Sequence, residues 1–135
     1  MERHEISIST HGRGTIELTK KINTLITKSG KDLMQCHLFL QHTSASLILC
    51  ENADPDVLID LEMYFAALIK DGDSRFCHTA EGADDMPAHI RTVLTQNSIT
   101  IPIINNTLAL GTWQGVFLWE HRIRPHHRTV IVTLQ

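Results

Sequence analysis

Histidine is unusually frequent in this sequence, with nine among 135 residues. Three of them could meet in space, because His42 ends a predicted strand, His78 lies in an irregular segment and His89 lies on a predicted helix. Three neutral imidazoles that converged from separate elements would form a tetrahedral metal site with one open position, which is typical of catalysis. The spacing contains no HxH or HExxH pair, and taken alone it favours the alternative of packed histidines with hydrogen-bonded rings.

A group of acidic residues, Glu81, Asp84 and Asp85, lies at the start of the predicted helix that carries His89. Asp85 and His89 are four residues apart and would be neighbours on the helix surface, so Asp85 could orient the imidazole. The alternative is that Asp84 or Asp85 simply caps the helix and opposes its dipole. The two roles can coexist.

The segment 110–115 (LGTWQG) is an unusual approach to a strand. Its two glycines permit close backbone approach, while Trp113 and Gln114 offer a flat ring and an amide that could hold a planar heterocycle. The alternative is a tight structural bend around a buried tryptophan whose ring N–H is satisfied.

The segment 121–128 (HRIRPHHR) places three arginines and three histidines within eight residues. Arg122, Arg124 and Arg128 could hold a phosphate through their guanidinium forks. A charged strand edge that prevents aggregation would explain much of the same pattern. The sequence shows no Ser-His-Asp order, nucleophile elbow or P-loop.

Apolar periodicity predicts the elements that must position these residues. Alternation at 6–8 and 16–18, on either side of Gly12 and Gly14, predicts a hairpin. Helical spacing predicts helices at 19–29, 54–71 and 83–94. The second helix should bury Val57, Leu58, Leu61, Phe65 and Leu68, and the third should turn Met86, His89, Ile90, Val93 and Leu94 inward. The remaining predicted strands are 32–42, 47–50, 98–104, 115–123 and 129–134.

This element order predicts one α+β domain spanning residues 1–135, with a mostly antiparallel sheet and two to three helices packed on one face. With 42% hydrophobic residues, 20% charged residues and a net charge of −3, the composition fits a globular protein without affinity for nucleic acid. No apolar run is long enough to span a membrane, and the start does not read as a secretory signal. The odd, widely spaced Cys36, Cys50 and Cys77 argue against disulfides and a thiolate zinc site, so we expect a cytoplasmic location.

Three segments closely resemble the YjbQ-like family: 41–46 (QHTSAS), 81–90 (EGADDMPAHI) and 110–114 (LGTWQ). The resemblance covers essentially the whole chain. It implies a compact α+β fold whose sheet curves into a half-barrel, assembly as a homotrimer, and a weak, secondary thiamine-phosphate synthase activity. It also implies a cleft lined by the motif histidines that holds a metal ion or an anion.

Carried over by position, the resemblance places His42, His78 and His89 at this site and matches Trp113 and Gln114 to the family's GTWQ turn. At the end of the chain the family usually has Arg after the last Pro. Here Pro125 is followed by two histidines before Arg128, so which basic residue would hold an anion stays open.

Two hypotheses follow, and the first is an enzyme that joins a pyrimidine diphosphate to a thiazole phosphate and releases pyrophosphate. The histidines would bind a zinc-like ion, and magnesium would accompany the diphosphate. His42, Asp85 and Glu120 are the acid–base candidates. The expected contacts to a small phosphorylated ligand come from Ser44, Ser46, Trp113, Gln114, Arg122 and Arg128. The second hypothesis is a non-catalytic trimeric protein that binds a metal or a small anion.

Overall fold

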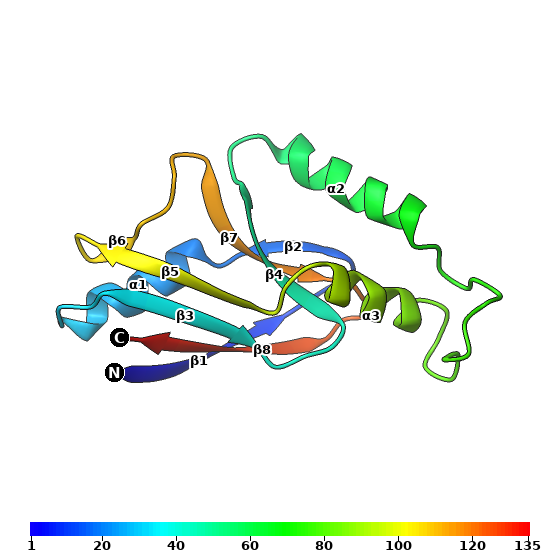
Figure 1. Cartoon of the computed structure of the whole chain (residues 1–135), viewed down its shortest axis with the longest axis horizontal. Coiled ribbons are helices and arrows are strands. Elements are labelled where there is room, and N and C mark those ends of the chain that lie inside the picture. The colour runs from blue at the N-terminus through cyan, green and yellow to red at the C-terminus, as the bar shows by residue number, and fades with distance from the viewer.

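The computed structural model describes all 135 residues, and its strands form two antiparallel sheets. The strands are β1 (Glu2–Ser9), β2 (Gly14–Glu17), β3 (Gln35–Leu40), β4 (Ala45–Glu51), β5 (Ser98–Ile104), β6 (Thr107–Leu108), β7 (Gln114–Glu120) and β8 (His127–Leu134). The larger sheet has the order β1-β8-β3-β5-β6, and the smaller has the order β2-β7-β4. Both contribute to one core of 20 buried apolar residues, so together they curve into the expected half-barrel (Figure 1).

The predicted hairpin between the first two strands is wrong. β1 pairs with β8, with Ile6 opposite Val130, and β2 pairs with β7, with Ile16 opposite Leu118. The chain crosses from one sheet to the other at Gly12 and Gly14, whose φ angles are 120° and 145°. Alternation specifies which side chains face the core and is the same whichever strand lies alongside, so it could not reveal these distant partners.

Helix α1 (Thr19–Ser29) has the predicted bounds. Ile22 and Ile26 are buried in the core, and Gly30 ends the helix with a left-handed φ of 63°. The helix therefore closes the core from the side, next to β6 and β7.

Helix α2 (Pro55–Leu68) begins as predicted, because Asp54 accepts a hydrogen bond from the backbone N–H of Asp56 at 2.9 Å and Pro55 occupies the first turn. The predicted buried stripe holds only in part: Val57, Leu58, Leu61 and Phe65 are half-buried, Leu68 is exposed, and no residue of α2 is fully buried. The helix leans over the outer face of the smaller sheet, where Phe65 lies 4.8 Å from Trp119 between ring centroids, and otherwise projects outward (Figure 1). Periodicity predicts an apolar face but not whether the same chain covers it.

Helix α3 (Asp85–Leu94) buries a different face from the predicted one. Val93 is 83% exposed and Leu94 is also exposed, whereas Asp85, Ala88 and Arg91 are buried. Asp85 pairs with the buried Arg122 and Arg91 with the partly exposed Glu62, which offsets part of the cost of burying their charges. The inward prediction therefore holds only in part for His89, which is half-buried at the edge of this face.

The predicted fold class is confirmed: an antiparallel half-barrel with three helices. α2 and α3 cover the outer face of the smaller sheet, and α1 packs on the core. None of the helices combines the length and apolar character needed to cross a membrane.

Candidate metal centre

Three side chains that can bind a metal ion meet beside the start of α3. His78, Asp85 and His89 offer ligand atoms that all lie within 4.8 Å of one another. Asp85 and His89 are brought together by one helical turn. His78 reaches them because the loop after α2 folds back, with the N–H of Gly72 donating to the carbonyl of Ala83 at 3.0 Å. The structure thus unites two of the three predicted histidines with the predicted carboxylate.

Asp85 is the centre of this cluster. Its Oδ2 lies 2.5 Å from Nε2 of His78 and 3.1 Å from Nε2 of His89, while its Oδ1 accepts from Nη1 of Arg122 at 2.5 Å. Burial tends to raise the pKa of Asp85, but the hydrogen bond from His78 and the charge of Arg122 outweigh it and the pKa is lowered. The carboxylate is therefore ionised and faces both imidazoles.

The second ring nitrogen of His89, Nδ1, already has a hydrogen-bond partner. Nδ1 lies 3.0 Å from the carbonyl oxygen of Thr43, which can only accept, so Nδ1 carries a proton. In a neutral ring, Nε2 would then direct a lone pair at the Asp85 carboxylate, which is repulsive. The contact becomes favourable when Nε2 is protonated or when a metal ion lies between the two groups. An Nδ1–H donated to a backbone carbonyl is also the usual support of a metal-binding histidine.

Arg122 is fully occupied by the loop and α3. Its Nε donates to Asp84 at 2.9 Å, and its Nη2 donates to the carbonyl of Glu81 at 2.9 Å, in addition to the bond with Asp85. Asp84 makes no side-chain capping bond and accepts instead from Arg122 and from the N–H of Ile123. Arg122 thus holds the candidate centre in place, and its predicted role of binding phosphate would require it to leave these partners.

Glu120 and Arg128 form a buried ion pair away from the three ligands. Two nitrogens of Arg128 donate to the two carboxylate oxygens at 2.9 and 2.5 Å, and Thr10 donates to Glu120 at 2.6 Å. Burial tends to raise the pKa of Glu120, but the bonds from Arg128 and Thr10 prevail and lower it. Arg128 also donates to the hydroxyl of Ser44 at 2.9 Å. The structure therefore joins three predicted site residues to one another and leaves none of them free for a ligand.

His42 is not part of the ligand group. Its Nε2 accepts from the backbone N–H of Thr129 at 2.8 Å, and its pKa is lowered by burial and by the charge of Arg128. It shares a surface hollow of about 430 Å³ with His89. His42 thus lies next to the candidate centre and is fixed as a neutral ring.

Ser46 bonds to His121 in the interior, with 2.7 Å between Oγ and Nε2, and also contacts Thr95. The sequence places His121 in the basic segment 121–128, but its ring is fully buried. Burial and the charge of Arg91 lower the pKa of His121 to about 3. Ser46 is also fully buried, so this pair supports the packing of α3 and cannot meet a ligand.

Trp113 and Gln114 lie at the far end of β7 from Glu120. Seven residues of extended strand separate the two ends by roughly 20 Å. Trp113 is 61% exposed, and Gln114 accepts from the N–H of Gly111 at 2.8 Å and closes the turn. The structure therefore does not bring these two residues to the histidine cluster, and the alternative of a buried tryptophan is wrong.

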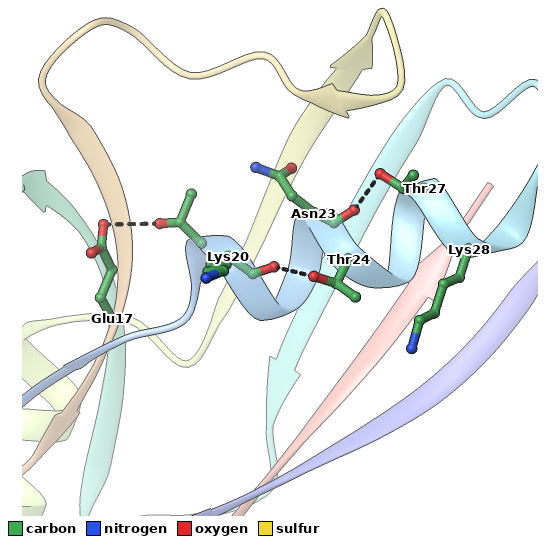
Figure 2. Close-up of a pocket in the computed structure, with 7 residues that line it drawn as sticks. Glu17, Lys20, Asn23, Thr24, Thr27 and Lys28 are labelled. Atoms are coloured by element: carbon green, nitrogen blue, oxygen red, sulfur yellow. Dashed lines mark hydrogen bonds between the residues drawn. The ribbon is translucent and has the colours of Figure 1, made fainter.

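A larger hollow of about 640 Å³ follows the exposed side of α1 (Figure 2). Two of its hydroxyls turn back on their own helix, with Thr24 donating to the carbonyl of Lys20 and Thr27 to that of Asn23. The side chains of Lys20 and Lys28 are exposed. Its titratable residues, Glu17, Lys20 and Lys28, form no ion pair with one another, so we look for the candidate site at α3 instead.

One ion pair, between the buried Arg91 and Glu62, was not predicted from the sequence. Nη1 of the fully buried Arg91 donates to Glu62 at 2.6 Å, and the ring N–H of Trp119 donates to the same carboxylate at 2.7 Å. The available signal was the spacing of three between Asp85, Ala88 and Arg91, which places them on one face of α3. From the sequence alone, an arginine on that face would be predicted to be exposed, because nothing local identifies Glu62 as its partner.

Comparisons with known proteins agree with this architecture. Residues 4–135 match the family model described as UPF0047 protein YjbQ-like. A UPF0047 protein of Synechocystis sp. is 55% identical over 125 residues, covering 93% of this chain and 85% of that protein. The UPF0047 protein YjbQ of Escherichia coli O157:H7 is 41% identical over 131 residues, covering 96% and 94%. The crystal structure of a conserved hypothetical protein from Thermus thermophilus superposes with a TM-score of 0.88 at 30% identity, covering 98% and 99%.

Proposed function

The chain belongs to the YjbQ-like UPF0047 family, and from its candidate centre we propose that it binds one divalent metal ion through His78, Asp85 and His89. The observation that carries the proposal is the contact between Nε2 of His89 and Asp85, made by a ring whose Nδ1 is already a donor to Thr43. A cation between the two groups removes the repulsion.

The donor set indicates the kind of metal. Two imidazoles and one carboxylate suit zinc or a similar transition metal better than magnesium, which prefers oxygen ligands. Three protein ligands leave a coordination position for water or a ligand, and a metal bound there would act as a Lewis acid. The chain's own contribution is to hold the ligands in place: Thr43 orients His89, and Arg122 fixes Asp85.

Metal binding can be tested on protein purified without a histidine tag. We expect one zinc ion per chain in the wild type and none in His89→Ala, measured by elemental analysis after dialysis. His37→Ala is the matched control, because His37 bonds only to Thr100 in β5 and lies in a different sheet from β4 and β7. Equal metal content in His89→Ala and wild type, or no metal in either, would remove the proposal.

A second candidate function is the transferase activity that the family resemblance implies. We propose that formation of thiamine phosphate and pyrophosphate from the pyrimidine diphosphate and thiazole phosphate depends on this metal. Departure of pyrophosphate needs a cation to stabilise its charge. Arg122 and Arg128 are already paired with carboxylates, so we assign this role to the metal rather than to either of these two arginines. A nitrogen-rich site is poorly matched to magnesium diphosphate, which agrees with a weak, secondary activity.

The assay for this activity compares zinc-loaded, magnesium-supplemented and chelator-treated protein with the two precursors. We expect product only with metal, and its loss in His89→Ala. Equal rates with and without metal would contradict the metal dependence. Zinc binding without any product would leave the alternative function, a metal- or anion-binding protein. Glu120 favours that alternative: Arg128 and Thr10 already donate to its carboxylate, so this acid–base candidate is not available to a substrate.

We also propose the homotrimer that the resemblance implies. It is supported by α2, where Ile59, Met63, Tyr64 and Leu68 are all more than half exposed, an arrangement that further copies of the chain would cover. Light scattering should give three times the 15.3 kDa of one chain. Ile59→Glu should lower that mass while the control Asp60→Lys does not, and a monomer mass for the wild type would contradict the trimer. All three cysteines are free, which is compatible with the proposed cytoplasmic location.

A further inference from the structure

The hollow beside His89 has an unusual lining. It measures about 430 Å³, a volume typical of small-molecule sites, and among the residues that line it are His42, His89, Thr92, Thr95, Gln96 and Asn97. None of the lining side chains belongs to Lys, Arg, Asp or Glu. The hollow is therefore polar, and apart from His89, whose Nε2 faces the Asp85 carboxylate, its lining carries no charged group.

The neighbouring arginines do not supply that missing charge. Arg122 is paired with Asp84 and Asp85, and Arg128 is paired with Glu120. An anionic group that entered the hollow would lose its hydration without meeting a free cation, which is costly. The hollow thus discriminates against phosphate and carboxylate groups.

His42 lines the hollow and has one ring nitrogen that is not used within the chain. Its Nε2 accepts from the N–H of Thr129 at 2.8 Å, so the proton of the neutral ring is on Nδ1. Nδ1 has no hydrogen-bond partner within the chain. It is free to donate to a ligand oxygen.

Thr92 supplies an acceptor. Its hydroxyl donates to the carbonyl of Ala88 at 2.9 Å, so the lone pairs of its oxygen stay available to a ligand N–H or O–H. Gln96 and Asn97 add both kinds of group, because their side-chain amides are exposed and make no hydrogen bond within the chain. Their backbone carbonyls are fixed by the N–H groups of Leu47 and Leu40, at 2.9 and 2.8 Å.

From this lining we infer that the hollow is a subsite for the uncharged, hydroxyl-bearing portion of a small molecule. His89 forms a wall of both the hollow and the ligand cluster, so such a molecule would place its neutral portion here and a charged portion at the metal. The second half of this statement rests on the proposed metal centre. The first half rests on the lining alone.

The test uses metal-free protein and two probes, D-ribose and inorganic phosphate, followed by NMR of the side-chain amides of Gln96 and Asn97. We expect D-ribose to shift both signals saturably and phosphate to leave them unchanged. Asn97→Leu should weaken ribose binding roughly 5-fold, the worth of about one hydrogen bond. The control Gln41→Leu, an exposed amide outside the hollow, should bind as the wild type does.

Three results would overturn the inference: no shift with D-ribose, a saturable shift with phosphate, or equal weakening in Asn97→Leu and Gln41→Leu. The metal centre is tested separately by zinc titration of the same samples. Loss of ribose binding in a protein that binds zinc overturns only the subsite, and ribose binding in a protein that binds no zinc contradicts only the metal centre.

Discussion

Nε2 of His89 lies 3.1 Å from Oδ2 of Asp85, although Nδ1 of the same ring already donates to the carbonyl of Thr43. A neutral imidazole carries one proton, so this ring can satisfy only one of the two contacts by itself. The second contact requires an additional cation, a proton or a metal ion. Because Nε2 of His78 lies at the same carboxylate oxygen and could serve as a second nitrogen ligand, we propose a metal ion.

Asp85→Asn should weaken zinc binding strongly. The variant keeps the size of the side chain but removes the negative charge between the two imidazoles. We expect a loss of more than about 100-fold in affinity by calorimetry, because loss of supporting partners alone costs 10- to 100-fold. Asp32→Asn, an exposed carboxylate, is the control and should bind zinc normally. Unchanged affinity in Asp85→Asn would show that the carboxylate is not a ligand.

Arg122→Lys tests the group that holds Asp85. An ammonium cannot serve the planar set of three acceptors that the guanidinium reaches, Asp84, Asp85 and the carbonyl of Glu81. Zinc affinity should fall about 10- to 100-fold, while circular dichroism shows a folded protein. If Arg122 instead binds phosphate, the variant should lose phosphate affinity and keep its zinc affinity.

His121 should make the protein sensitive to mild acid. Its pKa is about 3 in the folded chain and 6.5 as the ordinary value, so the unfolded state binds the proton more readily. Stability is therefore present above pH 6.5 and falls as the pH drops toward 3, by about 1.4 kcal/mol for each pH unit. His42 acts in the same direction, because burial lowers its pKa as well.

The variant His121→Gln isolates this effect. Urea unfolding of wild type and variant between about pH 6.5 and 4.5, above the ordinary pKa range of carboxyl groups, should show a shallower loss of stability in the variant. Parallel curves would mean that His121 does not titrate on unfolding in this range. Lower absolute stability of the variant does not affect the comparison of slopes.

The ion pair between Arg91 and Glu62 predicts which of two substitutions destabilises the protein more. Glu62→Ala leaves the fully buried Arg91 without its partner, which should cost about 3–5 kcal/mol. Arg91→Met leaves Glu62, which is partly exposed and can be hydrated, and removes two guanidinium nitrogens that are buried without partners. Arg91→Met should therefore be the milder change in urea unfolding, and the reverse order would contradict this account.

Local patterns predicted the elements well and their neighbours poorly. The helix at Thr19–Ser29 and the inward positions of Cys36, Leu38 and Leu40 follow directly from periodicity, because one chain segment carries the whole signal. The pairing of β1 with β8 joins segments more than a hundred residues apart, and no local signal specifies it. The exposed face of α2 shows the same limit, since periodicity does not say what covers a face.

The candidate centre was predicted in part. The spacing of Asp85 and His89 identified them as neighbours, but it suggested that the carboxylate only orients the ring, whereas it faces both histidines. Arg122 and Arg128 read as free cations because their partners, Asp84, Asp85 and Glu120, contact them only after folding. The sequence shows which residues are charged, but only the tertiary structure shows which of them are paired.

The most direct test of the account is a crystal of zinc-loaded protein measured on both sides of the zinc absorption edge. We predict one anomalous peak per chain at roughly 2.0–2.2 Å from Nε2 of His78, Oδ2 of Asp85 and Nε2 of His89. A peak at His42 or among His126 and His127, or no peak at α3 in zinc-loaded crystals, would contradict it.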